Sequence, residues 1–278
     1  MAPWLITLLI ILGVCLLLGL IYLLVLIRPR ARKPSNEALL CDYAHRGLHG
    51  GEIPENSLAA FEKACEAGFG IELDVQLSRD GTVMVFHDYT LARMTGREGK
   101  LKELDAAELQ SLSLNGTTET IPTFAEVLAL VDGRVPLLVE LKGENLDTSL
   151  CEKVASHLSA YKGTYCLESF NPLLIGYVKR KRPEYKRGQL VTILKKKDAN
   201  QPFPVRFMLS HMLLNFISRP HFIAFDMMKK PTVGILAASS VLGAKKFAWT
   251  VRSAEDYNSL KERGILSIFE NFTPSDDA

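Results

Sequence analysis

Short apolar runs alternate along this chain with segments in which apolar residues recur every three or four positions. The runs are strand-like, and they are Cys41–His45, Gly70–Gln76, Val135–Leu141, Thr164–Ser169, Gly188–Leu194, Phe222–Asp226, Lys246–Val251 and Leu266–Glu270. The segments between them have helical spacing, and they are Ser57–Ala67, Phe124–Leu130, Leu150–Tyr161, Leu173–Lys181, Val205–Ile217, Val233–Leu242 and Ala254–Arg263. This alternation over ~240 residues predicts an α/β fold, a (β/α)8 TIM barrel. The alternative is a doubly wound open sheet, which usually has fewer strands and a glycine-rich first turn.

One further apolar run, Val83–His87, follows the second strand too closely for a crossover helix. The Asp80-Gly81 pair before it is typical of a two-residue hairpin turn. Counting back along the ladder from such a turn places His87 opposite Asp74. We therefore expect a hairpin that rises above the second strand and returns His87 to the level of that carboxylate.

The N-terminal segment differs from the rest, because no charged residue occurs from Trp4 to Ile27. At ~1.5 Å per residue, such a helix crosses a hydrocarbon core of ~30 Å. A cleaved signal peptide is disfavoured, since no lysine or arginine precedes the run and no A-x-A site follows it. Basic residues come directly afterwards, at Arg28, Arg30, Arg32 and Lys33. Because positive flanks stay inside, we expect a single-pass protein of the cell membrane whose body faces the cytoplasm.

We accordingly divide the chain into a transmembrane anchor over 1–27, a juxtamembrane tether over 28–39 and one barrel domain over 40–278. The lipid bilayer is the expected partner of residues 4–27. The polar stretch 88–121 reads as an insertion in the barrel domain, a small subdomain over its mouth.

Composition supports this division. The 278 residues are 47% hydrophobic, which suffices for one large domain plus an anchor. A net charge of only +2 carries no global signature of nucleic-acid binding. The five cysteines show no CxxC spacing, which favours buried reduced thiols and fits a cytosolic body.

The second half contains two basic clusters, Lys179–Arg182 and Lys195–Lys197. We interpret them as solvated ends of helices and loops, and contact with anionic lipid headgroups is the alternative. The segment Phe203–Phe225 is mostly apolar. It reads as barrel helix and core, and an apolar rim near the membrane is the alternative.

Ionisable side chains stand at the ends of the first three strands of the predicted barrel. They are His45, Arg46, Glu72, Asp74, Glu140 and Lys142. The carboxyl ends of barrel strands share one face with the active site, so the fold is expected to gather these residues at one rim. A structural ion pair between Glu72 and Lys142 alone is a rival interpretation, but it does not account for the whole set.

Three of these residues, Glu72, Asp74 and Glu140, supply the carboxylate oxygens that Mg²⁺ or Ca²⁺ prefers. Zinc fits less well, because its protein sites usually use cysteine or histidine. Such a cation polarises a phosphoryl oxygen and orients a nucleophile.

The remaining residues suit the other needs of phosphodiester chemistry. Arg46 and Lys142 are suited to offset phosphate charge. Histidine side chains ordinarily have pKa values near neutrality, which suits His45 and His87 to act as a base and an acid.

The order of motifs resembles the glycerophosphodiester phosphodiesterase family, within the phospholipase-C-like phosphodiesterases. The resemblance runs from about Asp42 to about Glu270, and it rests on Tyr43-Ala44-His45-Arg46-Gly47, Pro54-Glu55-Asn56-Ser57, Glu72-Leu73-Asp74-Val75, Asp80-Gly81, His87-Asp88, Glu140-Leu141-Lys142, Ser169-Phe170 and Trp249-Thr250-Val251. The ordered set is far more specific than any one tripeptide.

The resemblance implies a TIM barrel with an insertion after His87, and hydrolysis of a glycerophosphodiester to glycerol 3-phosphate and an alcohol. It implies a cation held by Glu72, Asp74 and Glu140, with His45 and His87 catalytic. Asn56 would order the site, and Trp249 would line the glycerol pocket. It also suggests attack by the free glycerol hydroxyl through a cyclic phosphate. Direct attack by water is the rival, and the role of each histidine stays open.

Two positions depart from the family pattern. Members often have Thr-Asp before a proline after the last strand, where this chain has Glu270-Asn271-Phe272-Thr273-Pro274. Arg252 stands where asparagine is common. Both positions lie at the predicted mouth, so we expect them to bear on headgroup preference rather than on the core chemistry.

Two other functions compete with glycerophosphodiester hydrolysis. One is cleavage of lysophospholipids in the manner of a lysophospholipase D, suggested by the anchor and by the apolar segment Phe203–Phe225. The other is a catalytically silent lipid-binding barrel, which predicts loss of a carboxylate or a histidine, whereas all of them are present.

Overall fold

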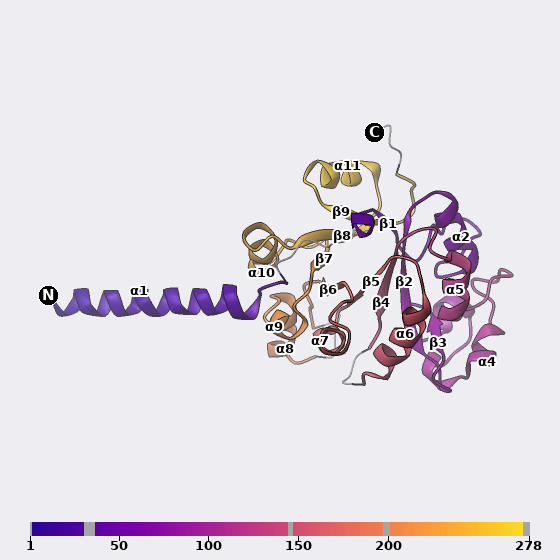
Figure 1. Ribbon diagram of the computed structural model, residues 1–278, viewed down its shortest axis with the longest axis horizontal. Coiled ribbons are helices and arrows are strands. Elements are labelled where there is room, and N and C mark those ends of the chain that lie inside the picture. Colours follow the sequence, from indigo (N-terminus) through magenta and orange to yellow (C-terminus); the bar gives the residue numbers. More distant parts are fainter. Residues whose placement is uncertain (1, 31–36, 144–146, 197–200, 275–278) are drawn as a thin grey trace.

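The computed structural model describes residues 2–30, 37–143, 147–196 and 201–274. Its central feature, within those ranges, is a closed barrel of eight parallel strands (Figure 1). The barrel strands are β1 (Tyr43–Ala44), β2 (Gly70–Leu77), β4 (Leu137–Leu141), β5 (Tyr165–Ser169), β6 (Arg187–Val191), β7 (Phe222–Asp226), β8 (Lys245–Val251) and β9 (Leu266–Phe269). Closure occurs at β1, where Tyr43 pairs with Gly70 of β2 and with Ile268 of β9. The predicted TIM barrel is confirmed, and the open doubly wound sheet is excluded.

Helices surround the barrel on its outside (Figure 1). They are α2 (Leu58–Glu66), α5 (Phe124–Val131), α6 (Ser149–Ala160), α7 (Pro172–Lys181), α8 (Phe203–Ser210), α9 (Asn215–Ser218), α10 (Val233–Leu236), η4 (Ala237–Val241) and α11 (Ala254–Glu262). Ser57 caps α2, because its hydroxyl accepts a hydrogen bond from the Ala60 amide at 3.2 Å. The predicted helix over Val205–Ile217 is wrong as one piece: it forms α8 and α9. Met212 between them has φ 60°, a left-handed backbone that no helix continues through.

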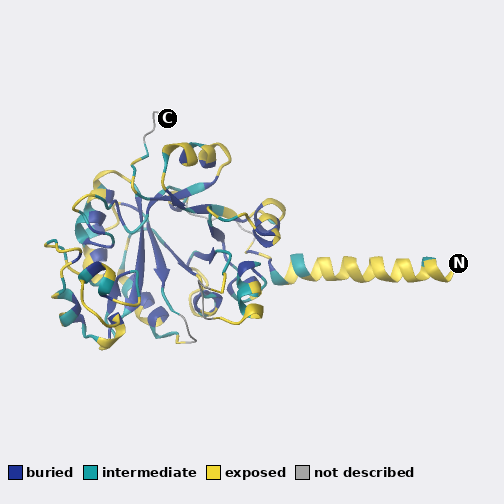
Figure 2. Ribbon diagram, turned by 180° about the vertical axis from the view of Figure 1, so that it is seen from behind, coloured by how far each residue is buried: buried dark blue, intermediate teal, exposed yellow. Residues whose placement is uncertain are grey.

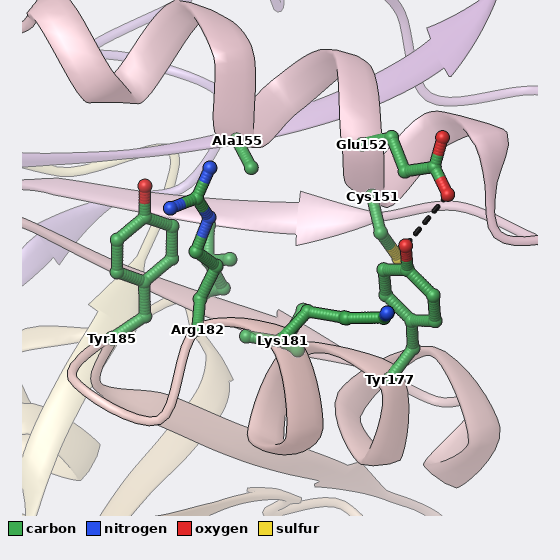
Figure 3. A pocket seen from close by; sticks show the side chains of 9 residues that line it. Cys151, Glu152, Ala155, Tyr177, Lys181, Arg182 and Tyr185 are labelled. Atoms are coloured by element: carbon green, nitrogen blue, oxygen red, sulfur yellow. Dashed lines mark hydrogen bonds between the residues drawn. The ribbon is translucent and has the colours of Figure 1, made fainter.

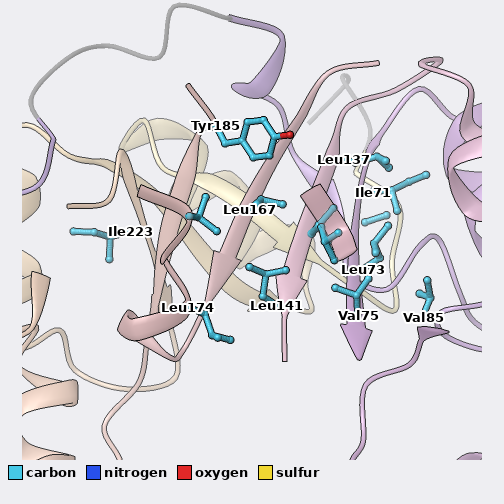
Figure 4. Close-up of a cluster of buried hydrophobic side chains, with 14 of the residues drawn as sticks. Ile71, Leu73, Val75, Val85, Leu137, Leu141, Leu167, Leu174, Tyr185 and Ile223 are labelled. Carbon is cyan, nitrogen blue, oxygen red and sulfur yellow. The ribbon is translucent and has the colours of Figure 1, made fainter. Parts of the chain in front are cut away.

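Side chains along the strands point alternately out of the barrel and into it, so the strands contribute to two separate buried clusters. Ile71, Leu73 and Val75 point outward into the apolar layer between the strands and the helices (Figure 4). Leu138 belongs to a second buried cluster with Tyr43, Ala224 and Phe247. Leu138 precedes Glu140 by two residues, so the two share the inner face of β4. The barrel is therefore plugged by apolar side chains at one level and lined by carboxylates at the next.

The hairpin after β2 differs by one residue from our expectation. Val75 pairs with Val85 and Leu77 with Val83 of β3 (Val83–Val85), so the ladder places Asp74 opposite Phe86. The Ser78 amide donates to the Thr82 carbonyl at 3.0 Å, which makes a three-residue loop with Gly81 at φ 77°. A three-residue hairpin that ends in a left-handed glycine is a common alternative to the two-residue turn. The predicted pairing of Asp74 with His87 is therefore wrong.

Residues 88–121 form a small layer of their own beside the barrel. It contains α3 (Ala92–Thr95), the short helix η3 (Leu101–Glu103) and α4 (Ala106–Gln110). These elements pack on a third apolar cluster, which joins Leu91, Leu101 and Leu109 to Met84 of β3. The expected insertion thus has a local core, and it is attached to the hairpin.

The N-terminal helix projects from one side of the body (Figures 1 and 2). It comprises α1 (Pro3–Ile21) and a π-helical turn, η1 (Tyr22–Leu26). By length and composition alone, the 24 residues Pro3–Leu26 suffice to cross a membrane, with mean hydropathy 3.1 and none of the span buried. Of the basic residues that follow, Arg28 and Arg30 are described, whereas Arg32 and Lys33 lie outside the described residues, as does much of the expected tether.

Candidate active site at the mouth of the barrel

Three buried carboxylates converge at the open end of the barrel. Glu72 and Asp74 lie two residues apart on β2, so both face inward, and Glu140 pairs with Asp74 on the adjacent strand β4. One oxygen from each of the three lies within 4.8 Å of the others. All three residues are buried, with exposed fractions of 3%, 1% and 7%. The structure thus brings together the three carboxylates that we expected to hold a cation.

Crowding of negative charge perturbs this trio. Burial, and then repulsion from Asp74 and Glu140, raises the pKa of Glu72 well above its usual value. Burial also raises the pKa of Glu140 to about 7, although Lys142 opposes the shift. Burial acts in the same direction on Asp74, but the nearby cations Lys142, His87 and Arg46 outweigh it, so the pKa of Asp74 is lowered.

This donor set fits a hard divalent cation. Carboxylate oxygens are the ligands that Mg²⁺ and Ca²⁺ prefer. A divalent charge between the three side chains would remove the repulsion that now raises the pKa values of Glu72 and Glu140. The three residues therefore satisfy both the chemistry and the electrostatics of such a site.

Cationic and amide groups frame the carboxylates. The Lys142 ammonium lies 3.4 Å from Asp74 Oδ1 and 3.2 Å from Glu140 Oε1. The Arg46 amide donates to Glu72 Oε2 at 2.9 Å, and its guanidinium Nε lies 3.5 Å from Asp74 Oδ2. Asn56 donates from Nδ2 to Asp74 Oδ2 at 2.9 Å. Lys142, Arg46 and Asn56 therefore lie around the three carboxylates, as the sequence predicts.

His45 stands next to the trio and carries a carboxylate partner of its own. Its Nε2 lies 4.0 Å from Glu72 Oε2, and its Nδ1 is 2.5 Å from Glu270 Oε2. Burial lowers the pKa of His45, and the hydrogen bond to Glu270 limits that fall. Glu270 in turn receives Arg252 Nε on its other oxygen at 2.7 Å.

His87 repeats this arrangement on the hairpin. Its Nδ1 is 2.6 Å from Asp88 Oδ1, and Asp88 Oδ2 accepts a bond from Arg93 Nε at 2.5 Å. Burial lowers the pKa of His87, while Asp74 raises it. Arg93 reaches Glu55 Oε1 at 2.6 Å, and Glu55 also binds the Arg46 guanidinium at 2.7 Å. One chain of ion pairs therefore links His87 to Arg46.

Sequence reasoning missed this set of partners. We had assigned Glu270 and Arg252 to headgroup preference only, yet Glu270 contacts His45 itself and Arg252 contacts Glu270. The sequence does contain a signal for the contact between Glu270 and Arg252, because both positions depart from the family pattern together. Asp88 had a signal in its position beside His87, whereas nothing in the spacing of Arg93 indicates its contact.

His49 completes a second group that is able to approach a cation, with His45 and Glu270. Two ligands at ~2.0–2.1 Å on one tetrahedral ion lie roughly 3.3 Å apart. The 2.5 Å separation of His45 Nδ1 and Glu270 Oε2 is a hydrogen bond instead. We therefore interpret this group as part of the network that positions His45.

Trp249 lies apart from the carboxylate trio, on β8. Its ring meets Phe170 edge-on at 5.6 Å between centroids. Phe170 lines a cavity of about 460 Å³ that also borders Glu140 and Lys142. The indole Nε1 of Trp249 is buried and has no hydrogen-bond partner among the described residues, so a donor remains for a polar ligand.

A separate cleft lies between α6 and α7, away from this chemistry (Figure 3). There the Tyr177 hydroxyl donates to Glu152 Oε1 at 2.6 Å. The Lys181 side chain extends toward Tyr177, and Arg182 lies next to Tyr185 (Figure 3). None of the predicted site residues lines it.

The mouth of this barrel holds three carboxylates, basic side chains and two histidines that are each paired with a carboxylate. This combination is typical of TIM-barrel proteins that process phosphodiesters. The sequence model described as "Glycerophosphoryl diester phosphodiesterase family" matches residues 45–274. The chain belongs to this family of hydrolases, which confirms the resemblance.

Related proteins are similar to this chain over most of its length. A glycerophosphodiester phosphodiesterase from Caldanaerobacter subterraneus subsp. tengcongensis is 31% identical over 237 residues, which cover 81% of this chain and 91% of that protein. An Oleispira antarctica phosphodiesterase, solved with its product sn-glycerol-3-phosphate, shares 27% identity with a TM-score of 0.67, covering 82% of this chain and 91% of the other. A Thermotoga maritima glycerophosphodiester phosphodiesterase shares 26% identity with a TM-score of 0.62, covering 83% and 94%.

Proposed function

We propose that this chain hydrolyses glycerophosphodiesters to glycerol 3-phosphate and an alcohol, with the help of a divalent cation. The observation that carries the proposal is the convergence of Glu72, Asp74 and Glu140 between two histidines that each hold a carboxylate partner. Family membership supports the reaction class, and the product bound to the Oleispira antarctica relative supports the glycerol 3-phosphate moiety.

Glu72, Asp74 and Glu140 would hold Mg²⁺ or Ca²⁺, which would supply charge neutralisation at a phosphoryl oxygen. Arg46 and Lys142 would bind the other phosphoryl charge, because both cations already lie within 3.5 Å of these carboxylates.

His45 and His87 are the proton-transfer groups of the proposal. One accepts the proton of the attacking hydroxyl, and the other donates a proton to the leaving alkoxide, so the P–O bond breaks without a free alkoxide. Glu270 and Asp88 orient the two rings through Nδ1, which leaves each Nε2 for the substrate. A cyclic phosphate intermediate and direct attack by water both use these two groups.

We also propose that α1 anchors the protein in the cell membrane, with residues 40–278 as one catalytic domain facing the cytoplasm and residues 88–121 as its insertion. The length and hydropathy of Pro3–Leu26 support the span, and Arg28 and Arg30 after it support the orientation. Protease protection in intact and opened cells tests the orientation.

The deciding experiment measures glycerol 3-phosphate release by the full chain in detergent. The substrates are glycerophosphocholine, glycerophosphoethanolamine and glycerophosphoinositol, each with Mg²⁺, Ca²⁺ or a chelator. A lysophospholipid is assayed in parallel by release of its head alcohol, because its cleavage leaves lysophosphatidate rather than glycerol 3-phosphate. We expect cation-dependent release from at least one glycerophosphodiester, lowered at least ~100-fold in His45→Ala and in Glu72→Ala.

The matched controls are His157→Ala and Glu255→Ala, which change the same residue types on α6 and α11. Both should retain the parent rate. Full release in the presence of chelator, or in His45→Ala, contradicts the proposed mechanism. Cleavage of the lysophospholipid alone would assign the lysophospholipase D reaction instead.

A further inference from the structure

We propose that the barrel rests on the bilayer surface through one defined face, in addition to its helical anchor. We call it the root face, and it consists of the exposed apolar side chains of α8, α9, α10, η4 and the loop after β7: Phe203, Phe207, Phe216, Met228, Val233, Leu236 and Val241. The inference rests on the proposal that α1 spans a membrane. It adds which side of the barrel meets the lipid.

The distribution of exposed apolar side chains singles out this face. Outside the N-terminal helix, α1 and η1, the large exposed apolar residues of the described chain number ten. Three of them, Tyr89, Phe170 and Leu173, border the cavity at the barrel mouth. The other seven belong to the root face. None lies on α2, α4, α5, α6 or α11, so the apolar surface is concentrated on the side from which α1 projects (Figure 1).

Helix α8 gives the most direct argument that this face meets a partner. Val205 and Leu209 line the mouth cavity. At about 100° per residue, Phe203 and Phe207 lie on the opposite side of the helix, and they are 69% and 45% exposed. A helix that is apolar on opposite faces is typical of a buried environment. One face of α8 turns toward the mouth cavity with Val205 and Leu209 partly buried, and the bilayer is the partner that would cover the other face.

Hydrogen bonds fix the end of the anchor beside this face. Asn215 of α9 donates from Nδ2 to the Ile27 carbonyl at 3.1 Å, and Arg219 donates from Nη1 to the Arg28 carbonyl at 2.9 Å. The Arg30 amide donates to the Pro220 carbonyl at 2.8 Å. Because the chain directly after the N-terminal helix is bonded to α9, a membrane that this helix enters would lie close to α9 and its neighbours.

Charge on the same segment suits anionic headgroups. Residues 201–243 contain four basic side chains, Arg206, Arg219, Lys229 and Lys230, and Asp226 as their single acidic one. The Asp226 carboxylate is already engaged by the Thr192 hydroxyl at 2.8 Å. Aromatic and aliphatic groups flanked by lysine and arginine are the composition of interfacial protein segments.

The test uses the full chain in vesicles of phosphatidylcholine and phosphatidylserine. The three accessible cysteines, Cys15, Cys41 and Cys65, are replaced by alanine, and the buried Cys151 and Cys166 are kept. One accessible cysteine for an environment-sensitive fluorophore is then placed by Phe207→Cys or by Leu236→Cys. The matched controls are Ala107→Cys on α4 and Ala129→Cys on α5, exposed positions on the side away from α1. A fifth variant keeps Cys15 as its one accessible cysteine, which reports on the anchor. Glycerophosphodiester hydrolysis by each labelled variant checks that it has folded.

Nitroxide-labelled lipids should quench the fluorophore at 207 and 236 at least about twofold more than at 107 and 129. Equal quenching at all four body positions, with strong quenching at Cys15, overturns the root face while the anchor stands. Absence of quenching at Cys15 overturns the anchor and with it this inference. Neither result bears on the hydrolysis reaction, which is measured separately.

Discussion

At the residue scale, the two histidines of the site are built in the same way. Each presents Nδ1 to a carboxylate, Glu270 for His45 and Asp88 for His87, and each carboxylate is held by an arginine on its other oxygen. A carboxylate on Nδ1 fixes the ring orientation and stabilises the protonated imidazole. Burial lowers both histidine pKa values, and the hydrogen bonds to Glu270 and Asp88 oppose that fall.

We predict that Glu270→Gln lowers kcat/KM by about 10–100-fold, the range typical of partners that orient a functional imidazole. The substitution removes the hydrogen-bonded charge that raises the pKa of His45, so burial then lowers this pKa further. The limb of the pH–rate profile that reports His45 should therefore move to lower pH, whichever role His45 has. The measurement is kcat/KM between pH 5 and 9.

The control for this prediction is Arg252→Gln, which leaves the His45–Glu270 bond in place. Arg252 is largely exposed, so its pair with Glu270 is screened and the change should be only a few-fold. A Glu270→Gln profile that superimposes on the parent profile would mean that Glu270 does not act through His45.

Residues of this kind mark the limit of prediction from the sequence. The carboxylates, Lys142 and His45 were predictable because strand alternation and barrel topology place strand ends on one rim. Glu270 follows the last strand and reaches His45 only because β9 pairs with β1 across the barrel closure. Its signal was a departure from the family pattern, and the pattern does not say which residue the new side chain contacts.

At the element scale, hydrophobic periodicity predicted the barrel strands and their helices, and it failed where one residue changes the outcome. The Asp80-Gly81 turn closes a three-residue loop instead of a two-residue one, which shifts the ladder and removes the predicted pairing of Asp74 with His87. The left-handed Met212 splits a continuous apolar pattern into α8 and α9. Both differences arise from the backbone conformation of single residues, which the periodicity of apolar side chains does not report.

The loop from β1 to α2 carries His45 and Arg46, and it depends on Gly47. Gly47 has φ 81°, and a Cβ there would lie 2.9 Å from Ala60 and Phe61 atoms of α2. We predict that Gly47→Ala destabilises the fold by about 2–5 kcal/mol, since left-handed strain and overpacking add. Activity should fall with it, because the clash displaces the loop. Thermal unfolding and kcat/KM measure both effects.

The matched control is Gly51→Ala in the same loop. Gly51 also has a left-handed backbone, at φ 62°, but nothing lies within 4 Å of its missing Cβ. That variant should lose only about 1–2 kcal/mol, the conformational part. Equal losses at the two positions would show that close packing on α2 is not what requires Gly47.

At the scale of the whole molecule, the N-terminal helix and the barrel are joined by side-chain packing as well as by the connecting chain. Ile27 is fully buried in the main apolar cluster, and Tyr22 packs against the same cluster. Composition predicted an anchor followed by a tether, and the first described residues after the helix are hydrogen-bonded to Asn215 of α9 and to Pro220, which precedes β7. Periodicity along the anchor gives no indication of this docking, because an apolar residue at the end of a span looks like one more lipid-facing residue.

We predict that Ile27→Ala in the full chain lowers stability by about 2–5 kcal/mol, the usual cost of emptying a buried isoleucine site. For a domain of this size the melting temperature in detergent should fall by roughly 2–4 °C per kcal/mol. Ile21→Ala removes the same atoms six residues earlier, where the side chain is 40% exposed on α1, and it should leave the melting temperature unchanged. A barrel that melts at the parent temperature in Ile27→Ala would show that the helix hangs from a free linker. Loss of stability at Ile27 alone means that the N-terminal helix and the barrel form one body. If the helix spans a membrane as proposed, its angle would then set how the mouth of the barrel faces that membrane.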